Sequence, residues 1–255
     1  MHVVSYSGGV CSWCAAKRVA ERHGTDNLIL LFADTQIEDE DTYRFLEESA
    51  ANVGGRLVRI ADGRTPWEVF RGVRFVGNSR VDPCSRILKR QLLDRWMKDN
   101  CNPETTIQYL GLNWDEINRL EVVRNRRPGW RIEAPMTEPP YLSKGEMLAE
   151  LKVQGIAIPK LYTLGFPHNN CGGFCVKAGQ AQFRLLLQTM PDRYKFHEKE
   201  EAGMLEYLQT ENATVLVDRS GGKKTPLSLE KFRFRIEQQP GLFDKHDWGG
   251  CACGV

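Results

Sequence analysis

A glycine-containing run near the start of this 255-residue chain has the composition of an anion-binding loop. The run Ser7-Gly8-Gly9-Val10-Cys11-Ser12 follows a short β-prone stretch and precedes a helical pattern. Adjacent glycines let the backbone turn sharply and approach a ligand closely. The N–H groups at the start of the helix would then face an anion, and the hydroxyls of Ser7 and Ser12 would add two donors. The run predicts a phosphate site, and a plain turn between strand and helix is the alternative.

Cysteines form a second group of residues suited to chemistry. The chain has eight cysteines and no signal-peptide pattern at its start, so we expect a cytoplasmic protein, in which disulfides are rare. Thiolates in a glycine-rich turn or beside basic residues can bind a metal ion or an iron–sulfur cluster. We expect a [4Fe–4S] cluster with the ligands Cys84, Cys171, Cys175 and Cys253, or Cys251 as the last ligand. Structural zinc and uncoordinated thiols are the alternatives.

Alternating strand and helix patterns must position these residues. The β-prone runs are at 2–6, 27–33, 56–61 and 105–111, and the helical patterns between them are at 12–23, 39–53 and 87–97. This alternation predicts an α/β fold with a doubly wound, mainly parallel sheet. Ligands of such sheets bind outside the carboxyl ends of the strands, so the informative residues follow Tyr6, Ala33, Ala61 and Leu110.

Three ordered motifs resemble those of one superfamily. The run 7–12 is similar to the SGG-x-(D/C)-S loop of the adenine nucleotide α-hydrolases, also called PP-loop ATP pyrophosphatases. Asp34-Thr35-Gln36 with Glu38, and Pro83-Cys84-Ser85-Arg86 with Lys89, are similar to segments of the phosphoadenosine phosphosulfate (PAPS) reductase-like family. The resemblance implies a Rossmann-like, HUP-type fold that binds ATP or PAPS with Mg²⁺. It implies the nucleotide contacts Ser5, Ser7, Gly8, Gly9, Val10, Cys11, Ser12, Asp34, Thr35 and Gly111.

The chain departs from the family pattern at several positions. Gln36 replaces a glycine, and Cys11 stands where many members have aspartate. The reductases carry a catalytic cysteine in a C-terminal E-C-G-L-H segment, whereas this chain has only Cys251-Ala252-Cys253-Gly254 there. The resemblance therefore supports a nucleotide site more strongly than sulfate reduction.

Basic residues supply candidate phosphate contacts. Arg86, Lys89 and Arg90 are spaced to share one face of a helix, and Lys89 is a candidate catalytic residue. Residues 111–119 resemble the G-I-R…E-S-x-x-R stretch of the reductases, with Asn113 in place of the first arginine. This resemblance makes Arg119 the other catalytic candidate, as a triphosphate or sulfonucleotide contact, with an ion pair to Asp115 or Glu116 as the alternative. The stretch from Arg56 to Lys98 has eleven bases against four acids, which suits DNA or RNA as a partner unless it is simply a solvated face.

Beyond about residue 130 the patterns become less regular. Prolines interrupt residues 135–140, and a helix is expected at 144–154 with Ser143 as its N-cap. Further helices are expected from about residue 178 and at 228–236, with an extended segment at 214–217. We predict a nucleotide-binding α/β domain at 1–130 and a helical or irregular region at 131–255 that carries candidate cluster cysteines.

Three functions fit these features. The chain would be an ATP pyrophosphatase that adenylates an acceptor for sulfur transfer, a PAPS or adenosine 5′-phosphosulfate reductase that uses Cys251 or Cys253, or a non-catalytic nucleotide- or nucleic-acid-binding module. No apolar run reaches the roughly 20 residues that span a bilayer, so no membrane partner is expected. The sequence does not specify the acceptor or the oligomeric state.

Overall fold

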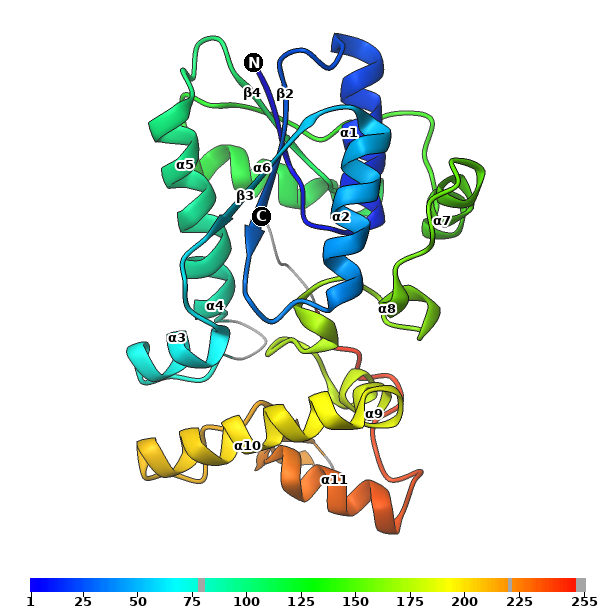
Figure 1. Cartoon of the computed structure of the whole chain (residues 1–255). Coiled ribbons are helices and arrows are strands. Elements are labelled where there is room, and N and C mark those ends of the chain that lie inside the picture. Colours follow the sequence, from blue (N-terminus) through cyan, green and yellow to red (C-terminus); the bar gives the residue numbers. More distant parts are fainter. Residues whose placement is uncertain (78–80, 220–221, 251–255) are drawn as a thin grey trace.

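The computed structural model describes residues 1–77, 81–219 and 222–250 (Figure 1). Its centre is a five-stranded sheet in the order β3-β2-β1-β4-β5, in which every neighbouring pair is parallel. The strands are β1 His2–Ser5, β2 Leu28–Asp34, β3 Arg56–Ala61, β4 Ile107–Leu110 and β5 Arg131–Glu133. The predicted α/β fold with a parallel sheet is confirmed. Its last strand, β5, lies beyond residue 130, where we expected the first domain to end.

Hydrophobic residues on both sides of the sheet explain its three layers. Every residue of β2 is buried, as expected of a central parallel strand. Leu28, Leu30 and Phe32 pack in one cluster with α1 Val10–His23, α2 Glu40–Val53 and α7 Lys144–Val153. Ile29 and Leu31 face the opposite side, where they pack against α5 Leu92–Asn100.

The sheet order places the first loop at a special point. Chain order runs outward from β1 in both directions, through β2 and β3 on one side and through β4 and β5 on the other. The crevice between β1 and β4 is therefore the topological switch point, where open parallel sheets bind ligands. Helix α6 Ile117–Arg126 follows β4 and packs Leu120 and Val123 against this half of the sheet.

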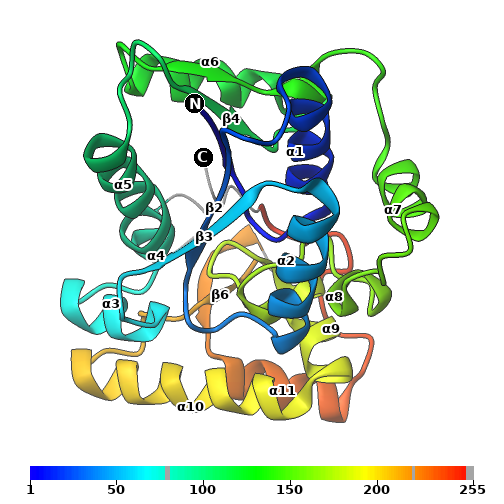
Figure 2. The same cartoon turned by 45° about the horizontal axis from the view of Figure 1, so that its top comes forward.

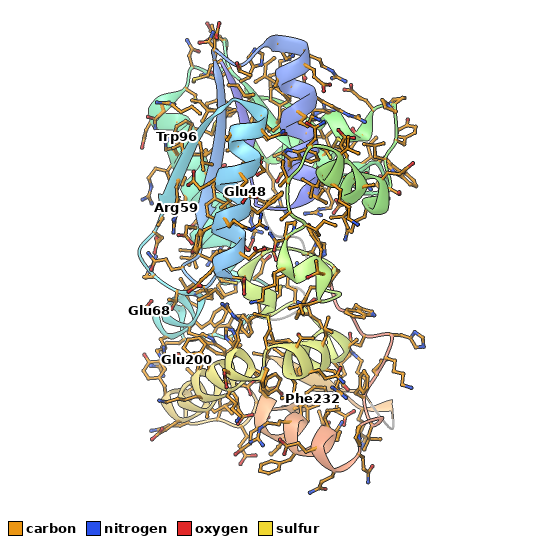
Figure 3. The ribbon with its side chains drawn as sticks, turned by 45° about the vertical axis from the view of Figure 1, so that its right-hand side comes forward. Glu48, Arg59, Glu68, Trp96, Glu200 and Phe232 are labelled. Carbon is orange, nitrogen blue, oxygen red and sulfur yellow. The ribbon has the colours of Figure 1, made fainter. Side chains whose placement is uncertain are left out.

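A helical layer lies below the sheet in Figures 1 and 2. It contains α9 Gln180–Thr189, α10 Pro191–Leu208 and α11 Leu229–Gln238, with the antiparallel pair β6 Leu216–Asp218 and β7 Thr225–Leu227. Buried Phe232 belongs to the core of this layer (Figure 3). Helix α3 Pro66–Val73 joins the layer to the sheet half, since Arg71 donates to Glu200 of α10 at 2.7 Å. Two short α-helices are α4 Pro83–Ser85 and α8 Lys160–Thr163.

One helix prediction is wrong in its first half. Residues Arg86–Gln91 form a π-helical segment, and regular α-helix begins only at Leu92. The predicted common face of three bases is consequently wrong: Arg86 is exposed, whereas Lys89 is only 5% exposed. Helices α3, α6 and α10 were not expected from the sequence. Among the described helices, none is both long and apolar enough to cross a membrane.

Candidate functional site

A cavity of about 430 Å³ lies at the switch point, beyond the ends of β1 and β4. Its floor is the first loop and the start of α1, and further walls come from the segment after β4, from α7 and from the loop 167–170. The lining residues that the sequence predicted are Ser5, Ser7, Gly9, Val10, Cys11, Ser12, Lys89, Gly111 and Arg119. The structure thus brings together residues from four separate parts of the chain.

Glycines determine the path of the first loop. Gly8 has φ +76°, a conformation that L side chains rarely adopt, and its carbonyl accepts a hydrogen bond from Asn169 Nδ2 at 2.8 Å. Gly9 is the N-cap of α1, and it has no side chain with which to cap the helix itself. The Val10 N–H donates to Tyr162 Oη at 3.2 Å. The N-terminus of α1 therefore presents N–H groups and its positive dipole end to the cavity, with no acidic residue in its first turn.

The end of β4 fits tightly against this helix start. A Cβ atom on Gly111 would lie 2.7 Å from the Cα of Ser12 and 2.8 Å from its backbone nitrogen. Only glycine allows β4 to approach the first turn of α1 this closely. The Ser5 hydroxyl is held by Gln108, whose Nε2 donates to it at 3.1 Å. Gln108 is oriented in turn by Arg127, which donates to Gln108 Oε1 at 2.8 Å.

Three cationic side chains line the cavity: Lys89, Arg119 and Lys144. Arg119 forms an ion pair with Glu116, which is the alternative raised for it from the sequence, and it lines the cavity as well. Cys11 also lines the cavity, and burial raises the pKa of its thiol to about 12, so it is a neutral group at pH 7. The acids Asp115 and Glu116 line the cavity too, so the three cations exceed the lining carboxylates by one, and Lys144 is the cation for which no ion pair is described among residues 1–77, 81–219 and 222–250.

Lys89 lies beside a buried carboxylate, Glu38, for which no role was predicted. Its Nζ lies 3.7 Å from Glu38 Oε1 and 3.9 Å from Cys171 Sγ. Glu38 also accepts from Thr35 Oγ1 at 2.9 Å and from the backbone N–H of Cys171. Burial raises the pKa of Glu38, and the Lys89 ammonium opposes this shift. The predicted contact Thr35 thus acts on Glu38 and lies outside the cavity lining.

Asp34 and Gly8 are likewise not among the lining residues. The carboxylate of Asp34 accepts from Arg59 Nε at 2.9 Å, from Tyr43 Oη at 2.9 Å and from the Gln36 N–H at 2.8 Å. Arg59 is marked on the outer part of the sheet in Figure 3. All these donors are the chain's own, so Asp34 fixes the turn after β2.

Several residues that line the cavity lie outside the three motifs from which the site was predicted. Lys144 and Met147 come from α7, Tyr162 from α8, and His168 from the loop that follows. Gly249 and Gly250, near the end of the chain, also line the cavity. For Lys144 and Met147 the sequence predicted the helix but no site, and the other segments were distinguished only by their polar, turn-rich composition.

The candidate cluster cysteines come together only in part. Cys171 and Cys175 are buried in one hydrophobic cluster, and Cys84 packs against it. Within residues 1–77, 81–219 and 222–250, no three His, Cys, Asp or Glu side chains are placed to hold one metal ion. Cys251 and the predicted ligand Cys253 lie outside the described residues. We derive no chemical step through a cluster.

Partners within the chain neutralise much of the basic stretch 56–98. Arg59, Arg64, Arg71, Lys89 and Arg90 form ion pairs with Asp34, Asp62, Glu200, Glu38 and Asp82, respectively. Arg74 stacks on Tyr207, with its guanidinium carbon 5.0 Å from the ring centroid. The net positive charge of residues 56–98, counted from the sequence, is therefore larger than the unpaired positive charge that a nucleic acid could contact.

No protein-family model matches this chain, and no curated protein matches it either. The fold and the site define it as an α/β protein with an open parallel sheet and a cationic cavity at the switch point.

Proposed function

We propose that the chain is an ATP pyrophosphatase of the HUP type, which binds an adenine nucleotide in this cavity and adenylates an acceptor. One observation carries the proposal: the glycine-capped N-terminus of α1 lines a cavity that is also lined by Lys89, Arg119 and Lys144. Helix N-termini with convergent cations are suited to polyphosphates. A volume of about 430 Å³ is in the range of small-molecule sites.

The proposed reaction follows from this charge distribution. An acceptor oxygen attacks the α-phosphorus of ATP, the bond from that phosphorus to the bridging oxygen breaks, and pyrophosphate leaves with the electron pair. Fixed N–H donors of α1 and the cations stabilise the charge that develops on the leaving group. Glu38 Oε1 lies 3.7 Å from Lys89 Nζ and would help to hold this side chain at the cavity wall. Mg²⁺, a hard cation with a preference for oxygen ligands, would neutralise phosphate charge, and Asp115 supplies a carboxylate in the same wall.

Binding of a non-cleavable ATP analogue tests the proposal directly. We expect α,β-methylene-ATP to bind the full chain, and we expect Arg119→Ala to weaken binding about tenfold, as loss of one charge-assisted contact implies. Arg56→Ala is the control, because Arg56 is exposed on β3 and does not line the cavity. Absence of binding, or equal affinities for the wild type and Arg119→Ala, would contradict the proposal.

A second function is favoured by one observation at the C-terminal end. Gly249 and Gly250 line the cavity, and Cys251 is the next residue in the sequence. In a sulfonucleotide reductase, a cysteine thiolate attacks the sulfur of PAPS and the bond from that sulfur to the bridging oxygen breaks. Adenosine 3′,5′-bisphosphate leaves with the electron pair, and a thiosulfonate forms on the cysteine. A thiol reductant then releases sulfite. Sulfite release from PAPS that is lost in Cys251→Ser or Cys253→Ser would support this function, whereas pyrophosphate release from ATP would support the first.

A further inference from the structure

The segment 244–250 is attached to the start of α9 by several hydrogen bonds. The Ala181 N–H donates to the Asp247 carbonyl at 3.0 Å, and the Gln180 N–H donates to the Asp247 carboxylate at 3.3 Å. Gly179, the N-cap of α9, has no side chain to cap the helix itself. Asp247 thus caps α9 from a position 67 residues away. Arg219 adds an ion pair to the same carboxylate at 3.1 Å.

Glycine is required on both sides of this contact. A Cβ atom on Gly179 would lie 2.1 Å from Asp247 Oδ1, and one on Gly249 would lie 2.2 Å from the Lys177 carbonyl oxygen. Gly249 also has φ +69°. The Gly250 N–H donates to the same Lys177 oxygen at 3.0 Å, and Gly249 forms a β-bridge with Ala178. The two backbones therefore touch without intervening side chains.

The attached segment ends in the wall of the nucleotide cavity, because Gly249 and Gly250 line it. We infer that Asp247 is a positioning residue, which caps α9 and thereby holds residues 249–250 as one wall of the cavity. Its effect on nucleotide affinity rests on the proposed function, whereas its effect on the segment's attachment does not. Asp247 itself is not among the lining residues and acts through the two glycines.

Hydrogen–deuterium exchange and nucleotide binding together test this inference on the full chain. In Asp247→Ala we expect faster exchange in 178–182 and 244–250, with affinity for α,β-methylene-ATP lowered about fivefold, a typical loss when one charge-assisted hydrogen bond is removed. Asp247→Asn keeps an acceptor oxygen for the Gln180 N–H and should restore most of both. Asp244→Ala is the matched control, because the Asp244 carboxylate accepts only from the His246 N–H, at 3.0 Å, among the described contacts.

A second variant guards against a general folding defect in Asp247→Ala. Gly249→Ala leaves the cap of α9 in place but forces the segment away from Lys177. We expect it to lower nucleotide affinity with normal exchange protection at Ala181. Unchanged exchange at 244–250 in Asp247→Ala, or unchanged affinity in both variants while the wild type binds, would overturn the inference. If the wild type binds no nucleotide, the proposed function fails, and the exchange measurement still decides whether Asp247 attaches the segment.

Discussion

The close approach of the end of β4 to α1 requires a glycine at position 111. A methyl group there would meet backbone atoms of Ser12, which cannot move aside without shifting the first turn of the helix. Gly111→Ala should therefore destabilise the fold by about 1–3 kcal/mol, as overpacking does, and lower nucleotide affinity at the same time. Thermal unfolding and binding of α,β-methylene-ATP measure the two effects.

A glycine on α3 provides the comparison for this substitution. Gly72 is helical, and a Cβ atom there would meet nothing within 4 Å. Gly72→Ala should stabilise the protein by about 0.5–1 kcal/mol, because alanine favours helix over glycine, and should leave binding unchanged. If Gly111→Ala left stability and nucleotide affinity as high as Gly72→Ala does, the tight contact between β4 and α1 would not be needed for the fold or for binding.

At the level of elements, helix α7 contributes Lys144 and Met147 to the cavity. Its start is fixed by a capping box, in which Ser143 accepts from the Glu146 N–H and the Glu146 carboxylate accepts from the Ser143 N–H at 2.7 Å. Ser143→Ala should cost about 1 kcal/mol and also weaken nucleotide binding, because Lys144 follows directly.

Helix α3 offers a matched control with the same motif. Thr65 and Glu68 form a capping box there, and no residue of α3 lines the cavity. Thr65→Ala should therefore lower the unfolding temperature about as much as Ser143→Ala while leaving nucleotide affinity unchanged. Equal affinity losses in both variants would show that the effect comes from general destabilisation.

The elements also show how far sequence reasoning extends. Strand β3 begins and ends at the predicted residues 56 and 61, and Ser143 caps α7 as predicted, because period and capping are local properties. The π-helical segment 86–91 could not be predicted, since its sequence reads as ordinary helix and the burial of Lys89 beside Glu38 is a tertiary effect. Asp34 was expected to contact a nucleotide, but its donors Tyr43 and Arg59 come from neighbouring elements that no motif records.

At the scale of the whole molecule, the buried carboxylate of Glu201 connects three segments of the helical layer. Glu201 on α10 accepts from the Val215 N–H at 2.7 Å and from the Leu229 N–H at 2.5 Å, so it joins α10 to the segment before β6 and to the start of α11. Burial raises the pKa of Glu201 to about 7 from its usual 4.5. His197 on the same helix titrates in the opposite sense, because burial lowers its pKa to about 3.

These two groups give opposite dependences of stability on pH. Between pH 4.5 and 7 the folded state binds the Glu201 proton more tightly than the unfolded state, so the Glu201 contribution is full below pH 4.5 and is lost as pH rises through 7. For His197 the unfolded state binds more protons between pH 3 and 6.5, so its contribution increases as pH rises. The wild-type profile is the sum of both, and neither group can be identified from that profile alone.

Glu201→Gln separates the two contributions. Glutamine has one acceptor oxygen where Glu201 has two, so the variant should be less stable than the wild type at pH 4.5, where the Glu201 contribution is full. The stability of the variant should not fall through the Glu201 window. The difference in unfolding free energy between wild type and variant should therefore shrink by about 3 kcal/mol from pH 4.5 to pH 7.5, which is the shift of the Glu201 pKa expressed as free energy. Urea unfolding at five pH values across this range measures it. A difference that stays constant with pH would mean that Glu201 titrates normally, because its two backbone hydrogen bonds fully offset the cost of burying its charge.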